Sequence, residues 1–416
     1  MNIVDTPEIG RRVRIIRRRR GLSLDVAAGL AGIGKSYLSM LELGQRGFNR
    51  RGLIEDLAGA LGCSVADLTG QPYLPPDRST ADTMASLPGI AVAVHDATLD
   101  DPPDLPTRPI EQLVSAVDQA TANLDEARFA LAAGGLDNLL TELHVVAVVR
   151  DTDDRRAALA ALADACMVAT SIARHLGHHE LAVNTARRGY DAAARLGDPA
   201  RSGLLAMHYA LGLTWMGARR RVSTLLDEAL AAITPVADPT AEETSPAQVA
   251  GMLHLTAALH QAQQDRTGAA DDHLGQAREL AKATGECNAL YQHFGPAHVA
   301  TWEIEIAVEL GRGPAVAERI GPDVPRMVEA LGSANRRCVL AFDLARAYGQ
   351  AEGTRDAEAI RALDTADRFT SQVRNVPVAR ELVADLHGRA RRRVWELDSL
   401  RNRFGIGGRG PRNVGS

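Results

Sequence analysis

The chain has 416 residues and a formal net charge of −5, and only 4% of its residues are aromatic. This length predicts two or three domains, and abundant Ala and Leu beside short β-branched runs favour helices throughout. No run of eighteen uncharged apolar residues and no signal-peptide core is present, so we expect a soluble cytoplasmic protein that does not enter a membrane.

The most informative segment is residues 21–44, which read GLSLDVAAGLAGIGKSYLSMLELG, the layout of two short helices joined by a tight turn. Ser23 is a good N-cap for the first helix. The inward face of that helix is expected to combine Leu24, Ala27, Ala28 and Leu30. Gly32 can adopt the positive φ that the turn needs. The second helix is expected over residues 35–43, and Gly44 is expected to end it.

The pattern continues on both sides of this segment, over residues 9–70. It is carried by Ile9-Gly10-x-x-Val13-x-x-Ile16-Arg17, Gly21-Leu22-Ser23, Tyr37-Leu38-Ser39, Leu41-Glu42-x-Gly44 and Leu57-Ala58-x-Ala60-Leu61-Gly62-Cys63-Ser64. These positions resemble the Xre/Cro/phage-repressor family. The resemblance implies a five-helix domain that binds operator DNA, usually as a dimer on an inverted repeat. The sequence departs from the family at Leu24, where a phosphate-binding Gln is common, and at Gly34, which replaces a Ser or Thr cap.

Residues 1–72, which we call the head, carry eleven basic and seven acidic side chains, a net charge of +4 that leaves −9 for the rest of the chain. A basic end on an acidic chain is what phosphate binding by that end requires. The chain has only two lysines and is generally rich in arginine, so the arginine run over residues 11–20 could also be a solvated helix face. We favour phosphate contact because this run belongs to the first helix of the resemblance.

Roles within the head follow from position and chemistry. The start of the second helix of a helix-turn-helix reaches base edges in the major groove. The expected base contacts are Lys35, Ser36, Ser39 and Met40. The expected phosphate contacts, which fix register without reading sequence, are Arg11, Arg17, Tyr37, Arg46, Arg50 and Arg51.

Two proline-bearing segments separate the head from the remaining helical part of the chain. Residues 73–109 are expected to form a linker with one helical segment near 80–98, broken or kinked at Pro88. Residues 110–403, which we call the body, are a succession of amphipathic segments, and residues 404–416 are expected to be a disordered tail.

The amphipathic segments of the body pair into helical hairpins. The expected groups are 110–150, 155–196, 199–234, 246–284, 288–331 and 334–373, with a final helix at 376–403. Turn glycines recur every forty to fifty-one residues, at Gly177, Gly217, Gly268, Gly311 and Gly353. The spacing predicts an all-α protein whose body is an α-solenoid, similar to tetratricopeptide repeats but with a longer period. An irregular helical bundle is the alternative.

No pattern in the sequence supports catalysis. Phosphate loops, nucleophile elbows and zinc-protease motifs are missing, and the four cysteines are too far apart for a zinc site. His175, His178 and His179 have helical spacing, but Gly177 is expected to end the helix and separate them. We therefore expect no enzyme activity, no cofactor and no bound metal.

A helical-repeat body is expected to bind a ligand in its groove. The candidate residues are His298, Trp302, Asn335, Arg336 and Asp343. In architecture the chain resembles peptide-responsive quorum-sensing regulators of Gram-positive bacteria, which implies a homodimer on operator DNA and a short peptide effector. The alternatives are a DNA-tethered scaffold that recruits a partner protein and a small-molecule sensor.

Overall fold

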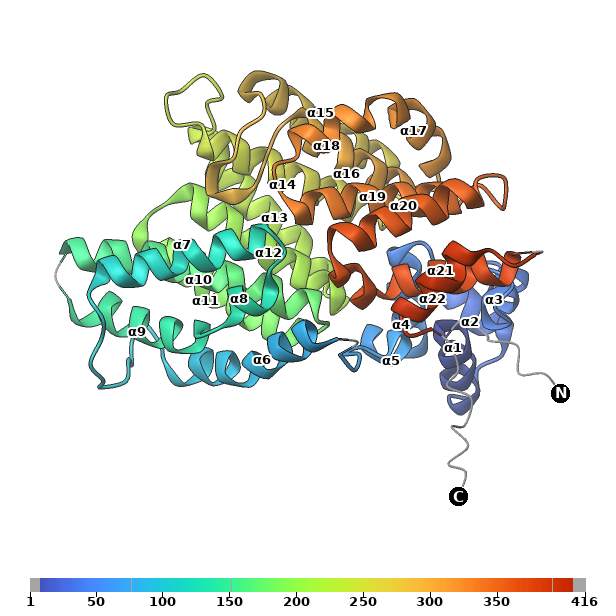
Figure 1. Cartoon of the computed structure of the whole chain (residues 1–416), viewed down its shortest axis with the longest axis horizontal. Helices are drawn as coiled ribbons and strands as arrows, with labels where there is room; N and C mark the ends of the chain where they lie inside the picture. Colours follow the sequence, from blue (N-terminus) through green and yellow to red (C-terminus); the bar gives the residue numbers. More distant parts are fainter. Residues whose placement is uncertain (1–7, 76, 151, 391, 407–416) are drawn as a thin grey trace.

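The computed structural model describes residues 8–75, 77–150, 152–390 and 392–406 (Figure 1). Every regular element in these ranges is a helix, which confirms the all-α prediction. The five head helices are α1 (Glu8–Arg19), α2 (Leu24–Leu30), α3 (Lys35–Glu42), α4 (Arg51–Leu61) and α5 (Val65–Thr69).

The helix-turn-helix of the head forms largely as the sequence predicts. The Ser23 side chain accepts a hydrogen bond from the backbone N–H of Val26 and so caps α2. Ala27 and Ala28 are buried, but Leu30 is 63% exposed, so the expected inward face of α2 is wrong at that residue. Gly32 has a φ of +68°, as the turn requires.

Gly10 allows α1 to pack directly against α3. A Cβ atom at this position would lie 2.2 Å from the backbone oxygen of Leu41, at the end of α3. A backbone atom cannot move aside as a flexible side chain can. The glycine of the Ile9-Gly10 motif is therefore required by the close approach of two helices.

Helix α6 (Arg78–Asp96) is part of the body fold rather than a free linker. It continues through Pro88, so of the break or kink expected at this residue the break is wrong. Asp77 caps it by accepting a hydrogen bond from the N–H of Thr80. Its apolar face, with Leu87 and Ile90, packs against α8 and α9.

The remaining helices follow the expected hairpins. They are α7 (Ile110–Asp125), α8 (Phe129–Ala133), α9 (Leu136–Val149), α10 (Thr152–His175), α11 (His179–Leu196), α12 (Pro199–Trp215), α13 (Arg219–Ile233), α14 (Ser245–Ala262), α15 (Thr267–Thr284), α16 (Pro296–Glu309), α17 (Gly313–Ile320), α18 (Val324–Ala330), α19 (Ala334–Gly349), α20 (Asp356–Phe369), α21 (Pro377–Arg389) and α22 (Trp395–Arg403). The expected single helix at 376–403 is in fact two, α21 and α22.

The body is layered like a solenoid. The first helix of each pair packs on the first helix of the next, in the series α10, α12, α14, α16 and α19. Two segments, 129–149 and 153–175, are long and apolar enough to span a membrane, but 56% and 78% of their most apolar windows are buried within the fold. Such burial is typical of core helices, which pass the same test of length and composition.

The end of the body returns to the head (Figure 1). Val378 of α21 joins the hydrophobic core of the head, and the Glu381 carboxylate accepts a hydrogen bond from the backbone N–H of Ile9. Phe404 is fully buried against Leu397 and Leu400 of α22, so the ordered body extends beyond the expected limit at residue 403. The rest of the expected tail, from residue 407, lies outside the described residues.

The close approach of α1 and α3 gives a test of the head fold. We expect Gly10→Ala to destabilise the head by about 1–3 kcal/mol, because the added methyl group overlaps backbone that cannot move freely. Gly29→Ala in α2 is the control, since its Cβ would have no neighbour within 4 Å. Amide hydrogen exchange of α1 and α3 measures both effects, and equal protection in the two variants would contradict the packing described.

Candidate nucleic-acid interface

The start of α3 is accessible. Lys35 and Ser36 are exposed, whereas Ser39 and Met40 are half-buried. The Lys35 ammonium pairs with the Asp25 carboxylate at 2.6 Å, and both side chains are more than half exposed, so this pair can open at little cost. Gly34 supplies no side-chain cap at the N-terminus of α3. Lys35 and Ser36 are therefore the best-presented of the four expected base contacts.

The expected phosphate contacts on α1 differ from one another in the structure. Arg11 is exposed, but Arg17 is only 7% exposed. Two nitrogens of the Arg17 guanidinium donate to the Glu42 carboxylate at 2.5 and 2.7 Å, and a third donates to the carbonyl of Leu22. In this arrangement Arg17 ties α1 to α3 and is not available to a phosphate.

The arginines after α3 point to the body. The Arg46 guanidinium pairs with Glu352 at 2.6 Å, and the Arg50 guanidinium pairs with Asp265 at 2.7 Å. Both body carboxylates are largely exposed, so each pair contributes only about 0–1 kcal/mol. Tyr37 lies beside the same loop, where the charges of Arg50 and Arg46 oppose the effect of burial, which raises its pKa. Two arginines expected to bind DNA phosphates, Arg46 and Arg50, are thus paired with carboxylates of the body.

A buried carboxylate of the body caps α4 of the head. Glu309, at the end of α16, is 1% exposed. Its two oxygens accept hydrogen bonds from the backbone N–H groups of Arg51 (3.0 Å) and Gly52 (3.2 Å). Arg50, the residue before the helix, provides no side-chain cap. A helix N-terminus is a favourable place for an anion, and here the anion comes from the other domain.

The Arg51 side chain continues this contact into the body. Its guanidinium lies 3.6 Å from the ring centroid of Trp215, at the end of α12. It also approaches Glu55 of its own helix at 3.3 Å. Burial lowers the pKa of Arg51, so the cation loses hydration that the aromatic ring and the carboxylates replace in part.

A second set of contacts makes the fit between α4 and the body close. The Arg219 guanidinium of α13 bonds to Asp56 at 2.7 Å and to Glu55 at 3.4 Å. A Cβ atom at Gly52 would lie 2.6 Å from the backbone oxygen of Gln263, just after α14. The head is therefore seated on the body with no room for a side chain at this glycine. We call this arrangement the docked state.

Two buried carboxyl groups, those of Glu55 and Glu381, make docking depend on pH. Burial raises the pKa of Glu55 to about 7, although Arg51 and Arg219 favour its charged form, and burial raises the pKa of Glu381 to about 7 as well. Each value lies above the ordinary 4.5 of a glutamate. The contribution of these groups to docking is therefore complete below about pH 4.5 and is lost as pH rises towards 7.

The five expected ligand residues of the body do not form one open cluster. The Trp302 indole N–H donates to His298 Nε2 at 2.7 Å, and His298 Nδ1 lies 3.0 Å from the carbonyl of His293. Asp343 is buried and bonded to Arg346 at 3.1 Å. Within the described residues no carboxylate lies at ion-pair distance from Arg336, although the charge of Asp125 acts on it, and only Gln292 bonds to its guanidinium, at 3.3 Å. Asn335 is half-buried.

The histidines that follow α10 are separated, as expected. Helix α10 ends at His175, and Gly177 has a φ of +82°. His175 Nδ1 bonds to the carbonyl of Ser171, whereas His179 Nε2 bonds to Gln71. No group of three or more His, Cys, Asp or Glu residues within the described ranges could hold a metal ion.

Comparison with known proteins agrees with the geometry of the head. Residues 8–69 match a family described as a helix-turn-helix domain. No curated protein and no solved structure matches the chain. The N-terminal unit is thus a helix-turn-helix domain, which supports a DNA-binding regulator, and the match does not extend to the body.

The exposed start of α3 and the loop arginines should respond differently to substitution. We expect Lys35→Ala to relax base preference at one or two positions, with a loss of about 1–3 kcal/mol on the best sequence. Arg50→Ala should weaken binding to all sequences alike and reduce the salt slope by about one. Competition binding to a randomised DNA pool at several salt concentrations separates the two. Unchanged binding by both variants would show that α3 is not the recognition helix.

Proposed function

We propose that the protein is a DNA-binding transcriptional regulator whose body holds the head in the docked state and releases it in response to a ligand. The observation that carries this proposal is the Glu309 carboxylate at the N-terminus of α4. An anion in this place competes with a DNA phosphate for the same backbone N–H groups and for the neighbouring arginines.

The docked state is poorly suited to bind DNA for two electrostatic reasons. Glu352 and Asp265 neutralise Arg46 and Arg50, which are the expected phosphate contacts after α3. The same carboxylates would also face the DNA backbone and repel it. Release of the head would free both arginines at once. A moderate change in the free energy of docking would therefore produce a large change in operator affinity.

Regulation by a ligand follows from the way the head is held. The exposed ion pairs are weak, and the buried contacts lie in two places, around α4 and where α21 packs against the head core. Such an interface can be biased by any molecule that binds the docked and released states differently. We further propose that two copies bind an inverted repeat, with recognition helices about 34 Å apart.

The effector expected from the sequence is a short peptide. One feature of the structure favours it: among the described residues the Arg336 guanidinium forms no ion pair at bonding distance, so a peptide's terminal carboxylate could pair with it. A protein-recruiting scaffold is the alternative, and it predicts operator affinity that does not depend on docking.

A single added methyl group, in the variant Gly52→Ala, tests whether docking controls DNA binding. We expect Gly52→Ala to bind operator DNA at least about fivefold more tightly than the wild type. The added Cβ atom would lie 2.6 Å from the Gln263 carbonyl oxygen, and this overlap should destabilise the docked state by about 1 kcal/mol or more. A destabilisation of about 1 kcal/mol corresponds to about a fivefold gain in operator affinity. Fluorescence anisotropy with an operator selected from genomic DNA measures the change.

The control is Gly59→Ala on the same helix, where a Cβ atom has no neighbour within 4 Å. It should gain helix stability and leave operator affinity unchanged. Equal affinities for the wild type and both variants, with the head of Gly52→Ala still folded by amide exchange, would refute control by docking.

A further inference from the structure

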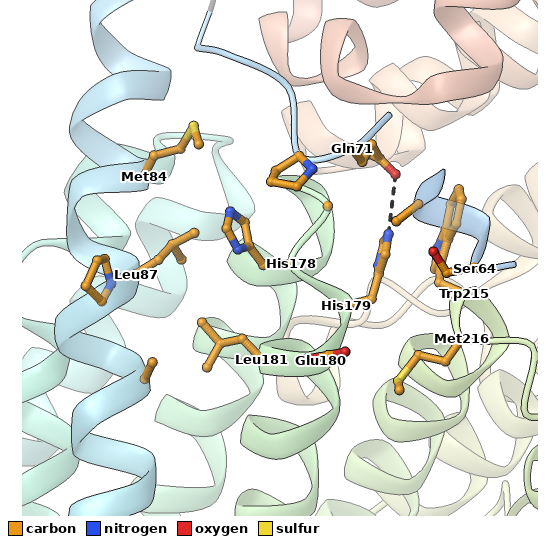
Figure 2. Close-up of a pocket in the computed structure, with 15 residues that line it drawn as sticks. Ser64, Gln71, Met84, Leu87, His178, His179, Glu180, Leu181, Trp215 and Met216 are labelled. Atoms are coloured by element: carbon orange, nitrogen blue, oxygen red, sulfur yellow. Dashed lines mark hydrogen bonds between the residues drawn. The ribbon is translucent and has the colours of Figure 1, made fainter. Parts of the chain in front are cut away.

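A cavity of about 590 Å³ lies where the head, the linker and the body meet (Figure 2). Its walls come from the residues at the start of α5, from Gln71 and Pro72, from α6, from the start of α11 and from the end of α12. This volume is within the range of sites that bind small molecules. The cavity has this form only while the head contributes Ser64 and Ala66.

The lining of the cavity selects for an uncharged, mainly apolar occupant. Met84, Leu87, Leu181, Trp215 and Met216 are its large apolar side chains (Figure 2). Among the described residues that line the cavity there is no Lys or Arg, and their one carboxylate, that of Glu180, belongs to an exposed residue. An anion would meet no cationic side chain in the described wall, and a free peptide would have to bury a charged terminus.

The wall also contains an imidazole, that of His178, with no partner among the described residues. The ring of His178 makes no hydrogen bond with the described residues, and burial lowers its pKa, which favours the neutral form. A neutral imidazole has one nitrogen that accepts a hydrogen bond. A ligand with an O–H or N–H group could donate to that nitrogen.

The other histidine of the wall connects the cavity to the head. His179 is 8% exposed and stacks on Trp215, with ring centroids 4.8 Å apart and planes at 6°. Trp215 is also the residue on which Arg51 of the head rests. His179 Nε2 bonds to the side-chain oxygen of Gln71, whose amide nitrogen donates to the carbonyl of Asn375. The cavity wall thus contains residues that contact two parts of the head, its last residues at Gln71 and helix α4.

We propose that this cavity binds an uncharged, mainly apolar small molecule with a hydrogen-bond donor, and that its binding stabilises the docked state and weakens operator binding. The regulatory half of this inference depends on the proposed function, whereas the binding site itself does not. Release of the head would remove one wall of the cavity, so the ligand binds the docked state more tightly.

The probe for the site is N-phenyl-1-naphthylamine, an uncharged aromatic amine with one N–H donor that fluoresces in apolar surroundings. We expect saturable binding by the full chain with a Kd on the order of 1–100 μM. Ala91→Phe fills the cavity from α6 and should weaken binding at least tenfold. Val92→Phe is the control, because Val92 is 62% exposed and does not line the cavity. His178→Phe should weaken binding about fivefold through loss of one hydrogen bond.

The same probe tests whether binding in the cavity changes the affinity of the protein for operator DNA. At saturation it should lower operator affinity of the wild type and of Val92→Phe several-fold and leave Ala91→Phe unaffected. Equal probe binding by the wild type and Ala91→Phe, or no saturable binding at all, overturns the site. Probe binding that is lost in Ala91→Phe but never changes operator affinity overturns its regulatory role. Failure of the proposed function is a separate result, since it would appear as a Gly52→Ala variant with unchanged operator affinity.

Discussion

The structure depends on one interaction between domains, the capping of α4 in the head by the Glu309 carboxylate of the body. Burying a carboxylate is costly unless its oxygens are bonded, and Glu309 meets this condition with two backbone N–H groups of the head and the guanidinium of Arg346. If the head departed, Glu309 would keep its bond to Arg346, and the two N–H groups of α4 would need another acceptor. A DNA phosphate is such an acceptor for the N–H groups of α4. The same chemistry that holds the head can therefore be exchanged for the chemistry of DNA binding.

The cavity at the junction adds a place where a ligand could act on this exchange. Its wall includes His179 and Trp215, and Trp215 carries Arg51 on its ring. The path from the cavity to the N-terminus of α4 is thus a short series of direct contacts. Because the exposed pairs of Arg46 and Arg50 are individually weak, the balance between docked and released states rests mainly on the buried contacts around α4 and on the packing of α21 against the head.

The sequence predicted the elements well and the contacts between domains poorly. Ser23, Gly32 and the helix at 35–42 follow local rules of capping and turn geometry, and the hairpins follow the apolar periodicity. Arg17 and Arg50 look alike in the sequence, yet one bonds within the head to Glu42 and the other bonds to Asp265, 215 residues away. No local pattern reveals such a partner. The contact of Glu309 with α4 could not be predicted from the sequence for the same reason. Nor could the need for a glycine at position 52, because a Cβ atom added there would meet the body rather than its own helix.

The most direct test of control by docking measures the distance between head and body with and without DNA. Spin labels at position 19 on α1 and at position 323 beside α18, both exposed, report the relative placement of the two parts by double electron–electron resonance once Cys63 and Cys287 are replaced by Ser. Control by docking predicts one narrow distance distribution for the free protein and a shifted or broadened one on operator DNA. An unchanged narrow distribution in the DNA complex would show that the docked head binds DNA, which contradicts this mechanism.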